Sequence, residues 1–397
     1  MTAFGLIGIM ISLAGFHFAR ANESRSRLIF FVLLLMAHIG ASIVTYFYSQ
    51  EFGGDVHIYY YDQLKIYGTQ SGLSTVFVVN FVQTLKTYLG GSFFDHFLLF
   101  QSMGFWGLLF VLRTFDDIHE ELGQPTFKKI YLLLFLPGLH YWTSAIGKDA
   151  PVFLGVAMCT WAAFRLQTRY LVFGAGVIVA LLVRPHIALI ALVALALTLL
   201  LGRNISLLTR AGLMAVVLGG ILAVAGLVEN MATGLNLSST DSVTEFLESS
   251  SQVSEASGAD MSIVGASFPV KLVSLLFRPF FIDANGLFGY GASLENVVLL
   301  LVMLTLIWRA RTALAVARSA MFARFAFFFF VMLTFLLAMV NYNVGLGLRQ
   351  KMMMMPALLV FFVAVMAVRS VRKNMEFAPA TPYHGGAPVA ARSYRRA

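Results

Sequence analysis

Charge is scarce in this sequence: charged residues make up 12% of its 397 residues, whereas hydrophobic residues make up 59%. A soluble protein of this length carries about 25% charged residues, so the composition excludes an ordinary soluble fold. Cysteine is nearly absent as well. The single cysteine, Cys159, excludes an intramolecular disulfide and any cysteine-cluster metal site. No hydrophilic stretch is long enough to form a separate folded domain.

Long apolar runs take the place of charge. Several reach roughly 18–20 residues, the length of a helix that crosses a bilayer. We therefore expect an all-α, polytopic integral membrane protein with about 11 transmembrane helices and interfacial helices on its outer face. The expected spans lie at about 3–19, 28–48, 96–113, 128–142, 150–166, 170–184, 186–202, 211–228, 292–308, 325–341 and 352–369. They would form a single transmembrane domain, 1–373, with outer loops at 49–95 and 229–291 and a disordered cytoplasmic tail at 374–397.

Basic residues are unevenly distributed over the loops between these spans. Most Lys and Arg residues fall in one set of alternate loops, which the positive-inside rule makes cytoplasmic. This places the C-terminus inside the cell and the N-terminus outside. The net charge of +9 is therefore a topology signal, and we expect no nucleic acid as a partner. The first 19 residues lack a preceding basic region and are interpreted as a membrane segment, not a cleaved signal peptide.

Three loop segments have recognisable patterns. Residues 73–90 space their apolar side chains as a helix lying on the bilayer surface would. Residues 236–267 are rich in Ser and acidic residues and poor in aromatic ones, which predicts a mobile loop that could act as a lid. On the cytoplasmic side, residues 114–127 are interpreted as a capped amphipathic turn.

The first polar cluster is GGDVHIYYYDQLKIYG, which follows the second apolar run. Helical spacing would put Asp55, Tyr59 and Asp62 on one stripe and His57 on the next. The polar groups would then converge on one surface. The tyrosines could instead form an interfacial aromatic belt, and Asp55 could be an ordinary surface acid, because an acid just above the membrane costs little to place. Both alternatives stay open at the level of the sequence.

Cations stand beside expected helix ends in several outer segments. In LPGLHYWTSAIGKDAPVFLG, Lys148 and Asp149 precede a helix that begins near Pro151, which predicts an anion site at a helix N-terminus. Asp149 could also be a plain helix cap. The further outer cations are Arg184 and His186 in LLVRPHIALI, Arg278 in LLFRPFFIDAN, and Arg349 and Lys351 in NYNVGLGLRQK. An isolated Arg is more often a snorkelling or capping residue, but the set favours a phosphate or diphosphate site.

Acids that could act as a base thus share one face with cations that could stabilise a leaving group. Sugar transfer from a polyprenyl-linked donor needs this combination, because a carboxylate or His57 would deprotonate the acceptor while Arg and Lys neutralise the departing phosphate. We assign catalysis to Asp55, His57, Asp62 and Asp149, phosphate binding to Lys148, Arg184, His186, Arg278, Arg349 and Lys351, and sugar stacking to Tyr59, Tyr60, Tyr141 and Trp142. The sequence requires no cofactor, although a divalent metal between Asp55 and Asp62 would be allowed.

These motifs also carry a family resemblance. The chain resembles the multi-span glycosyltransferases of the GT-C type, with Asp55 in the place of their early outer acidic residue. It is similar as well to bacterial O-antigen and exopolysaccharide polymerases of the Wzy and EpsG-like kind, in the stretches GDVHIYY, PGLHYWTSAIGKDA, RPHI and FRPFFIDANG…SLEN. Two departures weaken the GT-C likeness: those enzymes usually have a cytoplasmic N-terminus, and they often have a second acidic motif, for which only Asp149 is available.

The resemblance implies a membrane glycosyltransferase or polysaccharide polymerase of the bacterial inner membrane. Its partners would be a polyprenyl-(di)phosphate-linked sugar or oligosaccharide, the lipid bilayer and other polysaccharide-assembly proteins. The alternative is a transporter or flippase of the same lipid-linked oligosaccharide. A transporter would bury its polar residues near the bilayer midplane and often shows inverted repeats, whereas here the polar residues gather at one face and no repeat is visible.

Overall fold

A computed structural model of the chain describes residues 2–62, 73–126, 128–202, 206–231, 263, 265–284, 286–341 and 343–377. Within these ranges the fold is all-helical and contains no strand. The elements are α1 (Ala3–Phe18), α2 (Arg25–Phe52), α3 (Asp55–Tyr61), α4 (Thr75–Leu89), α5 (Phe93–Glu121), the 3-10 helix η2 (Lys129–Phe135), α6 (Pro137–Thr143), α7 (Asp149–Phe164), α8 (Leu166–Val183), α9 (Pro185–Leu200), α10 (Leu207–Met231), α12 (Phe268–Phe277), α13 (Gly286–Trp308), α14 (Ala310–Ser319), α15 (Met321–Val340), α16 (Val344–Lys351) and α17 (Met355–Phe377).

The helices have the length and composition of a membrane protein. In the described ranges, five are long and apolar enough to cross a bilayer: α2, α5, α8, α15 and the Phe288–Trp308 part of α13. α16 and α17 form a pair bent by 60°, which makes a sixth if it is one broken span. Large apolar side chains such as Met10, Met36 and Ile307 are more than half exposed, as expected of surfaces that face lipid. Several other expected spans coincide with shorter apolar helices of 10–17 residues.

The span expected at 128–142 is wrong. Residues 129–135 form the 3-10 helix η2, the backbone extends at Leu136, and a new helix, α6, begins at Pro137 and ends at Thr143. Proline causes the break: it lacks an N–H and its ring clashes with the preceding turn, so it is tolerated at the start of a helix but not in its interior. This segment is therefore two short helices, and the second of them contributes to a cavity described below.

The turn expected at 114–127 is also wrong over its first half, because α5 continues as a helix to Glu121. Its acidic residues are held there by buried cations. Arg27 Nη1 lies 3.0 Å from Asp116 Oδ1, and Arg169 Nη1 lies 2.6 Å from Asp117 Oδ2. These contacts join α2 and α8 to α5 and compensate charges that would otherwise be buried alone.

Loop boundaries shift as well. The outer loop expected at 49–95 is shortened, since α2 runs to Phe52 and α5 begins at Phe93 behind a capping box formed by Ser92 and Asp95. It contains α3 and α4, and α4 confirms the helix expected at 73–90.

The loop expected at 229–291 is bounded by α10 and α13, and most of the Ser-rich segment 236–267 lies outside the described residues. α17 extends to Phe377, beyond the expected start of the tail, and 378–397 are also outside the description.

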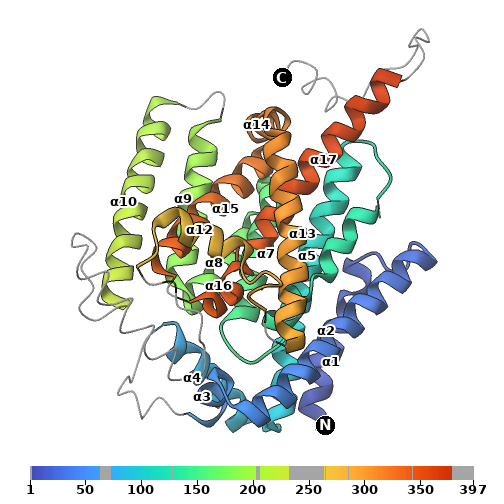
Figure 1. Ribbon diagram of the computed structural model, residues 1–397, viewed down its shortest axis with the longest axis vertical. Helices are drawn as coiled ribbons and strands as arrows, with labels where there is room; N and C mark the ends of the chain where they lie inside the picture. Colours follow the sequence, from blue (N-terminus) through green and yellow to red (C-terminus); the bar gives the residue numbers. More distant parts are fainter. Residues whose placement is uncertain are drawn as a thin grey trace.

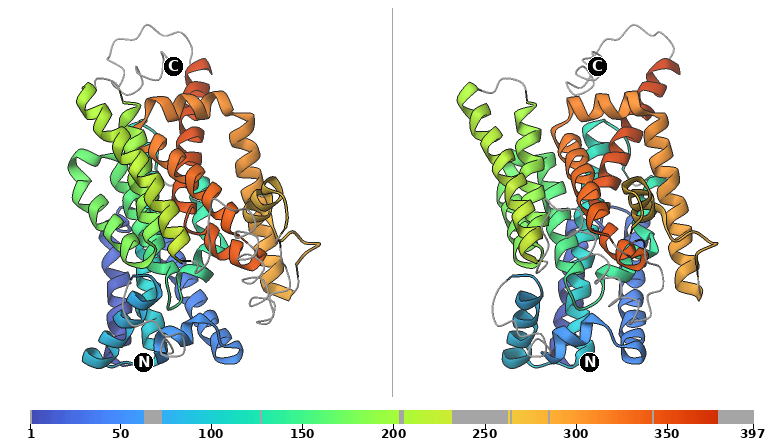
Figure 2. Two further views of the ribbon diagram at one scale, coloured as in Figure 1. Left: turned by 90° about the vertical axis from the view of Figure 1, so that its left-hand side faces the viewer. Right: turned by 60° about the vertical axis from the view of Figure 1, so that its left-hand side comes forward.

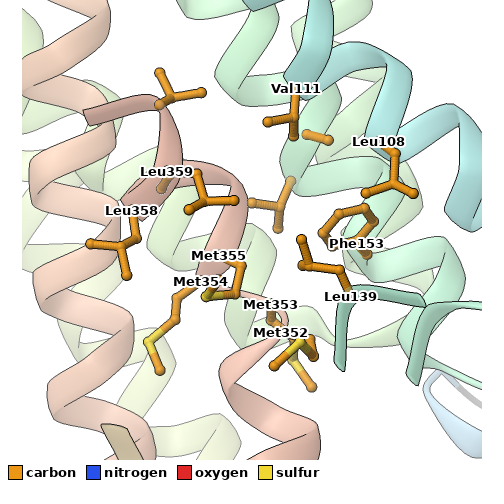
Figure 3. Packing of buried hydrophobic residues seen from close by; sticks show 14 of the residues in the cluster. Leu108, Val111, Leu139, Phe153, Met352, Met353, Met354, Met355, Leu358 and Leu359 are labelled. Carbon is orange, nitrogen blue, oxygen red and sulfur yellow. The ribbon is translucent and has the colours of Figure 1, made fainter. Parts of the chain in front are cut away.

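Two helices, α5 and α7, form the centre of the molecule. α5 packs against α1 and α7, and α7 packs against α8. The approach of α7 to α8 depends on glycine: a β-carbon at Gly155 would lie 2.7 Å from the carbonyl oxygen of Gly176. Four buried methionines, 352–355, lie at the turn between α16 and α17, next to Leu139 and Phe153 (Figure 3). Flexible side chains of this kind fill the irregular space left by a broken helix.

Different helices lie at the two ends of the molecule. The start of α1 lies at one end together with α3 and α4, and the last turns of α17 lie at the other, together with α14 (Figures 1 and 2). α16 lies in the half that contains the N-terminus (Figure 1). Segments that are far apart in the sequence and that were expected on one side of the membrane are thus close in space.

Candidate functional site

The candidate site is built around Arg349, on the short helix α16. This helix starts where the side chain of Asn343 accepts hydrogen bonds from the N–H groups of Gly345 and Leu346, at 2.6 and 3.4 Å. Such a cap satisfies N–H groups that a helix start leaves without partners. α16 then bends by 60° into α17, so it does not continue along the axis of the long helix. The bend places Arg349 beside the starts of α3 and α7.

Arg349 connects two carboxylates from distant parts of the chain. Its Nη1 lies 2.5 Å from Asp55 Oδ2, and its Nε lies 2.5 Å from Asp149 Oδ2. A second guanidinium, that of Arg184, reaches the same acid, with 3.2 Å between Nη2 and Asp149 Oδ1. The Asp149 side chain is 8% exposed and that of Asp55 is 52% exposed. The network is thus buried at Asp149 and open toward solvent at Asp55.

Local backbone features set these positions. Gly53 and Gly54 have φ values of +74° and +112°, which end α2 and allow α3 to begin at Asp55. Asp149 occupies the first turn of α7, where the positive end of the helix dipole stabilises a carboxylate. Arg184 lies at the break between α8 and α9, and Pro185 begins the new helix. Each charged group therefore sits at a helix terminus.

Lys148 adds a third cation to the cluster. Its Nζ lies 3.0 Å from Thr75 Oγ1 on α4 and donates to it. Burial, joined by the repulsion of Arg184 and Arg349, lowers the pKa of Lys148 to about 8, although Asp149 opposes the shift. The opposite balance holds for Asp55: burial alone would raise its pKa, but the charge and hydrogen bond of Arg349, together with the charges of Lys148 and Arg184, outweigh burial and lower it. Asp55 is thus held as a carboxylate at neutral pH.

The cluster has an excess of positive charge. Lys148, Arg184 and Arg349 supply three positive charges against the two negative charges of Asp55 and Asp149, which leaves one. Two further polar atoms, Arg184 Nε and His186 Nδ1, are buried without a hydrogen-bond partner among the described residues. A buried cationic group with a free donor is costly unless a ligand completes it. The arrangement therefore suits an anion.

Aromatic residue Tyr59 closes the cluster on one side. It is 2% exposed, and burial raises the pKa of its hydroxyl. Its ring lies against Gly147, where a β-carbon would be 3.3 Å from Tyr59 Cε2. Gly147 has a φ of +153°, so the chain passes close to the ring in a conformation that L side chains rarely adopt. Tyr59 is therefore part of the wall around Arg349.

The other predicted site residues of the segment GGDVHIYYYDQLKIYG make contacts outside the Arg349 cluster. α3 ends at Tyr61, and Asp62 caps it in the left-handed region with a φ of +53°, so Asp62 does not continue the stripe expected with Asp55. The ring of His57 stacks on Tyr61, and its Nε2 lies 2.8 Å from the carbonyl oxygen of Ser49. Tyr60 donates its hydroxyl to the carbonyl oxygen of Gly91 at 3.2 Å, and its ring packs against Phe93 and carries Lys86 on its face.

Two of the expected phosphate ligands are not in the Arg349 cluster. Arg278 forms a two-pronged pair with Asp283, with 2.9 and 3.0 Å between the hydrogen-bonded atoms. Lys351 is 1% exposed and donates to the side chain of Asn296 on α13. Arg349 and Lys351, which are two residues apart on α16, thus contact different partners, because side chains two positions apart on a helix point in different directions.

Tyr141 and Trp142 belong to a second site, a cavity of about 920 Å³ between α2, α6 and α13. Glu295 lines this cavity as well. The sequence marks Glu295 only as an acid at the start of an apolar run, and Thr75 carries no signal at all, so neither was assigned a role. Among the residues that the structure describes, no group of three or more His, Cys, Asp or Glu side chains could hold a metal ion.

Comparisons with known proteins give no assignment. No protein-family model, no curated protein and no solved structure matches the chain.

Proposed function

We propose that the protein transfers a sugar from a polyprenyl-(di)phosphate-linked donor, acting as a membrane glycosyltransferase or polysaccharide polymerase. Its place would be the outer face of a bacterial inner membrane, in the assembly of exopolysaccharide, O-antigen or glycolipid. The observation that supports this proposal is the Arg349 cluster, in which three cations meet two carboxylates at the junction of α3, α7, α9 and α16. The excess positive charge suits a phosphate leaving group.

The cations would bind and then stabilise the phosphate. Guanidinium groups hold phosphate oxygens with paired hydrogen bonds, and Arg184 retains a buried Nε without a partner among the described residues. As the bond between the anomeric carbon and the phosphate oxygen breaks, negative charge develops on the phosphate. Lys148, Arg184 and Arg349 would offset that charge in a partly buried setting, where electrostatic stabilisation is strong.

Asp55 would act chiefly through its charge. Its lowered pKa makes it a weak base, but a carboxylate that stays ionised can stabilise the positive charge that develops on a sugar ring in the transition state. Its side chain is half exposed, so a substrate can reach it. Asp149 is buried between Arg184 and Arg349 and would hold both guanidinium groups in position.

The test is a transfer assay on purified protein with a polyprenyl-diphosphate-linked oligosaccharide. The wild type should release the lipid phosphate and form a new glycosidic bond. Asp55→Asn and Arg349→Ala should each lower the rate by about a hundredfold or more, as expected for loss of a group that stabilises transition-state charge. Arg278→Ala is the matched control, because Arg278 pairs with Asp283 outside the cluster and should keep its rate.

A second readout separates enzyme from transporter. The same protein is placed in liposomes that contain the lipid-linked donor, and movement of the donor between leaflets is followed. Binding and leaflet exchange without any cleavage by the wild type would overturn the transferase proposal and support the flippase alternative.

A further inference from the structure

The cavity between α2, α6 and α13 opens toward the membrane. Its walls are mostly apolar or aromatic, and the rim includes Val44 on α2 and Phe288 and Leu294 on α13. These three side chains are 45%, 53% and 58% exposed. Both helices contain candidate spans, so hydrocarbon chains would surround these faces in a bilayer. A lipid chain can therefore enter the cavity from the side.

One carboxylate interrupts the apolar lining. Glu295 is 2% exposed, and its Oε2 accepts a hydrogen bond from the N–H of Gly138 at 2.5 Å. Its Oε1 is buried and has no hydrogen-bond partner in the described part of the chain. Lys351 acts on it through space, but its ammonium donates to Asn296 instead. A buried acceptor without a donor is unfavourable, and a ligand hydroxyl would satisfy it.

The cavity and the Arg349 cluster share one wall. Leu348 lines the cavity, and the next residue of α16, Arg349, enters the charged cluster. The two sites therefore lie on different sides of the same short helix. An anionic group and an apolar chain bound at the two sites would be neighbours.

We propose that this cavity binds the acceptor substrate, and that the acceptor is a membrane lipid with a free hydroxyl group. The chain of the lipid lies among the apolar and aromatic side chains, and its hydroxyl donates a hydrogen bond to Glu295 Oε1. The place of this lipid in a reaction rests on the proposed function. In that reaction, the hydroxyl oxygen forms a bond to the anomeric carbon and its proton passes to Glu295. The bond from that carbon to the phosphate oxygen breaks, and the phosphate leaves with the electron pair.

The binding test uses no sugar donor. Purified protein in detergent is titrated with dioleoylglycerol and with its 3-O-methyl ether, and bound lipid is counted by native mass spectrometry. The wild type should prefer the free hydroxyl by about tenfold, the effect of one hydrogen bond to a charged acceptor. In Glu295→Gln the amide oxygen keeps the hydrogen bond from the N–H of Gly138, so the amide NH2 faces the ligand. An NH2 group donates to a hydroxyl oxygen and to an ether oxygen alike, so this variant should lose the preference and still bind the methyl ether. An unchanged preference in Glu295→Gln would overturn the assignment of the hydroxyl to Glu295.

A pair of α2 variants tests the location. Ala41 lines the cavity, so Ala41→Phe should block it and lower dioleoylglycerol binding by about tenfold or more. Ile43, which does not line the cavity and is 38% exposed, provides the matched control Ile43→Phe, which should bind as the wild type does. Equal binding by both variants would place the lipid elsewhere and overturn the proposal.

Two other ligands, a soluble sugar and a polyprenyl phosphate, test which kind of molecule binds in the cavity. Maltotriose that displaces dioleoylglycerol would show that the cavity takes a soluble sugar, and a polyprenyl phosphate that loses its binding in Ala41→Phe would show that it takes the donor chain. Either result overturns the proposal. A hydroxyl preference that depends on Glu295, in a protein that transfers no sugar, would uphold the lipid site and reject the proposed function alone.

Discussion

The side chain of Arg349 contacts that of Asp149 across 200 positions of sequence, with 2.5 Å between Nε and Oδ2. The same guanidinium also reaches Asp55 through Nη1. A planar guanidinium can hold two carboxylates at once because its donors point in fixed, separate directions. One side chain thus joins the starts of α3 and α7 to α16, and its removal affects three helices.

Arg349→Ala should lower the free energy of unfolding by about 3 kcal/mol, because it removes one of the two guanidinium groups that form ion pairs with the buried Asp149. Arg349→Lys should recover part of this loss, since a single ammonium cannot replace both contacts. Unfolding in mixed detergent micelles, followed by circular dichroism, measures the change. Arg278→Ala, which removes a more exposed pair, should cost no more than about 1 kcal/mol. Equal losses for the two alanine variants would mean that the Arg349 cluster does not stabilise the fold.

Anion binding at the cluster should weaken as the pH rises through about 8. Below this pH Lys148 is protonated and the cluster carries one excess positive charge; above it the ammonium is lost and the excess disappears. Calorimetric titration with inorganic diphosphate on either side of this pH measures the effect. Lys148→Arg should keep the affinity constant across the same range, because arginine stays charged. Loss of affinity in Lys148→Arg at the same pH would assign the titration to another group.

Gly147→Ala should impair the site without unfolding the protein. The backbone there has a φ of +153°, and the added β-carbon would lie 3.3 Å from Tyr59 Cε2 and 3.9 Å from Arg349 Nη2. A shift of these groups by a few tenths of an ångström should slow sugar transfer by about tenfold, given the dependence of catalysis on position. Steady-state rates on the lipid-linked donor provide the measurement.

The control for this variant is Gly40→Ala on α2, where a β-carbon would meet nothing within 4 Å. Alanine is a better helix former than glycine, so this change should leave transfer unaffected and raise stability by up to about 1 kcal/mol. Slower transfer in Gly40→Ala would indicate a general effect of the membrane helices and not of the site.

The sequence identifies most of the residues of the Arg349 cluster, but it does not separate them from other polar residues at helix ends. Asp55, Asp149, Lys148, Arg184 and Arg349 were all expected to function, and the fold brings them together. Polarity and helix-end signals identify such residues because charge is rare in apolar sequence. The same signals also selected Arg278 and Lys351, because they cannot show which direction a side chain takes from its helix.

Helix existence was predicted more reliably than helix boundaries. Apolar periodicity locates α2, α5 and α15, but it misses the break at Pro137 because the residues on both sides are apolar. It also ends α5 too early, since the buried partners of Asp116 and Asp117 come from α2 and α8. Long-range ion pairs of this kind are not visible in a local pattern. The hydrogen bond from the N–H of Gly138 on α6 to Glu295 is a long-range contact of the same kind.

The placement of Leu348 and Arg349 on one short helix has a thermodynamic consequence. α16 is a short helix between a capped start and a 60° bend, and Leu348 and Arg349 are consecutive residues on it, so a tilt of the helix that moves Arg349 within the charged cluster also moves Leu348 at the cavity wall. If the two ligands favour different tilts, each lowers the affinity for the other, and by linkage the two factors are equal. A shared preferred tilt would make donor and acceptor bind cooperatively, so that neither site reaches full affinity while the other is empty.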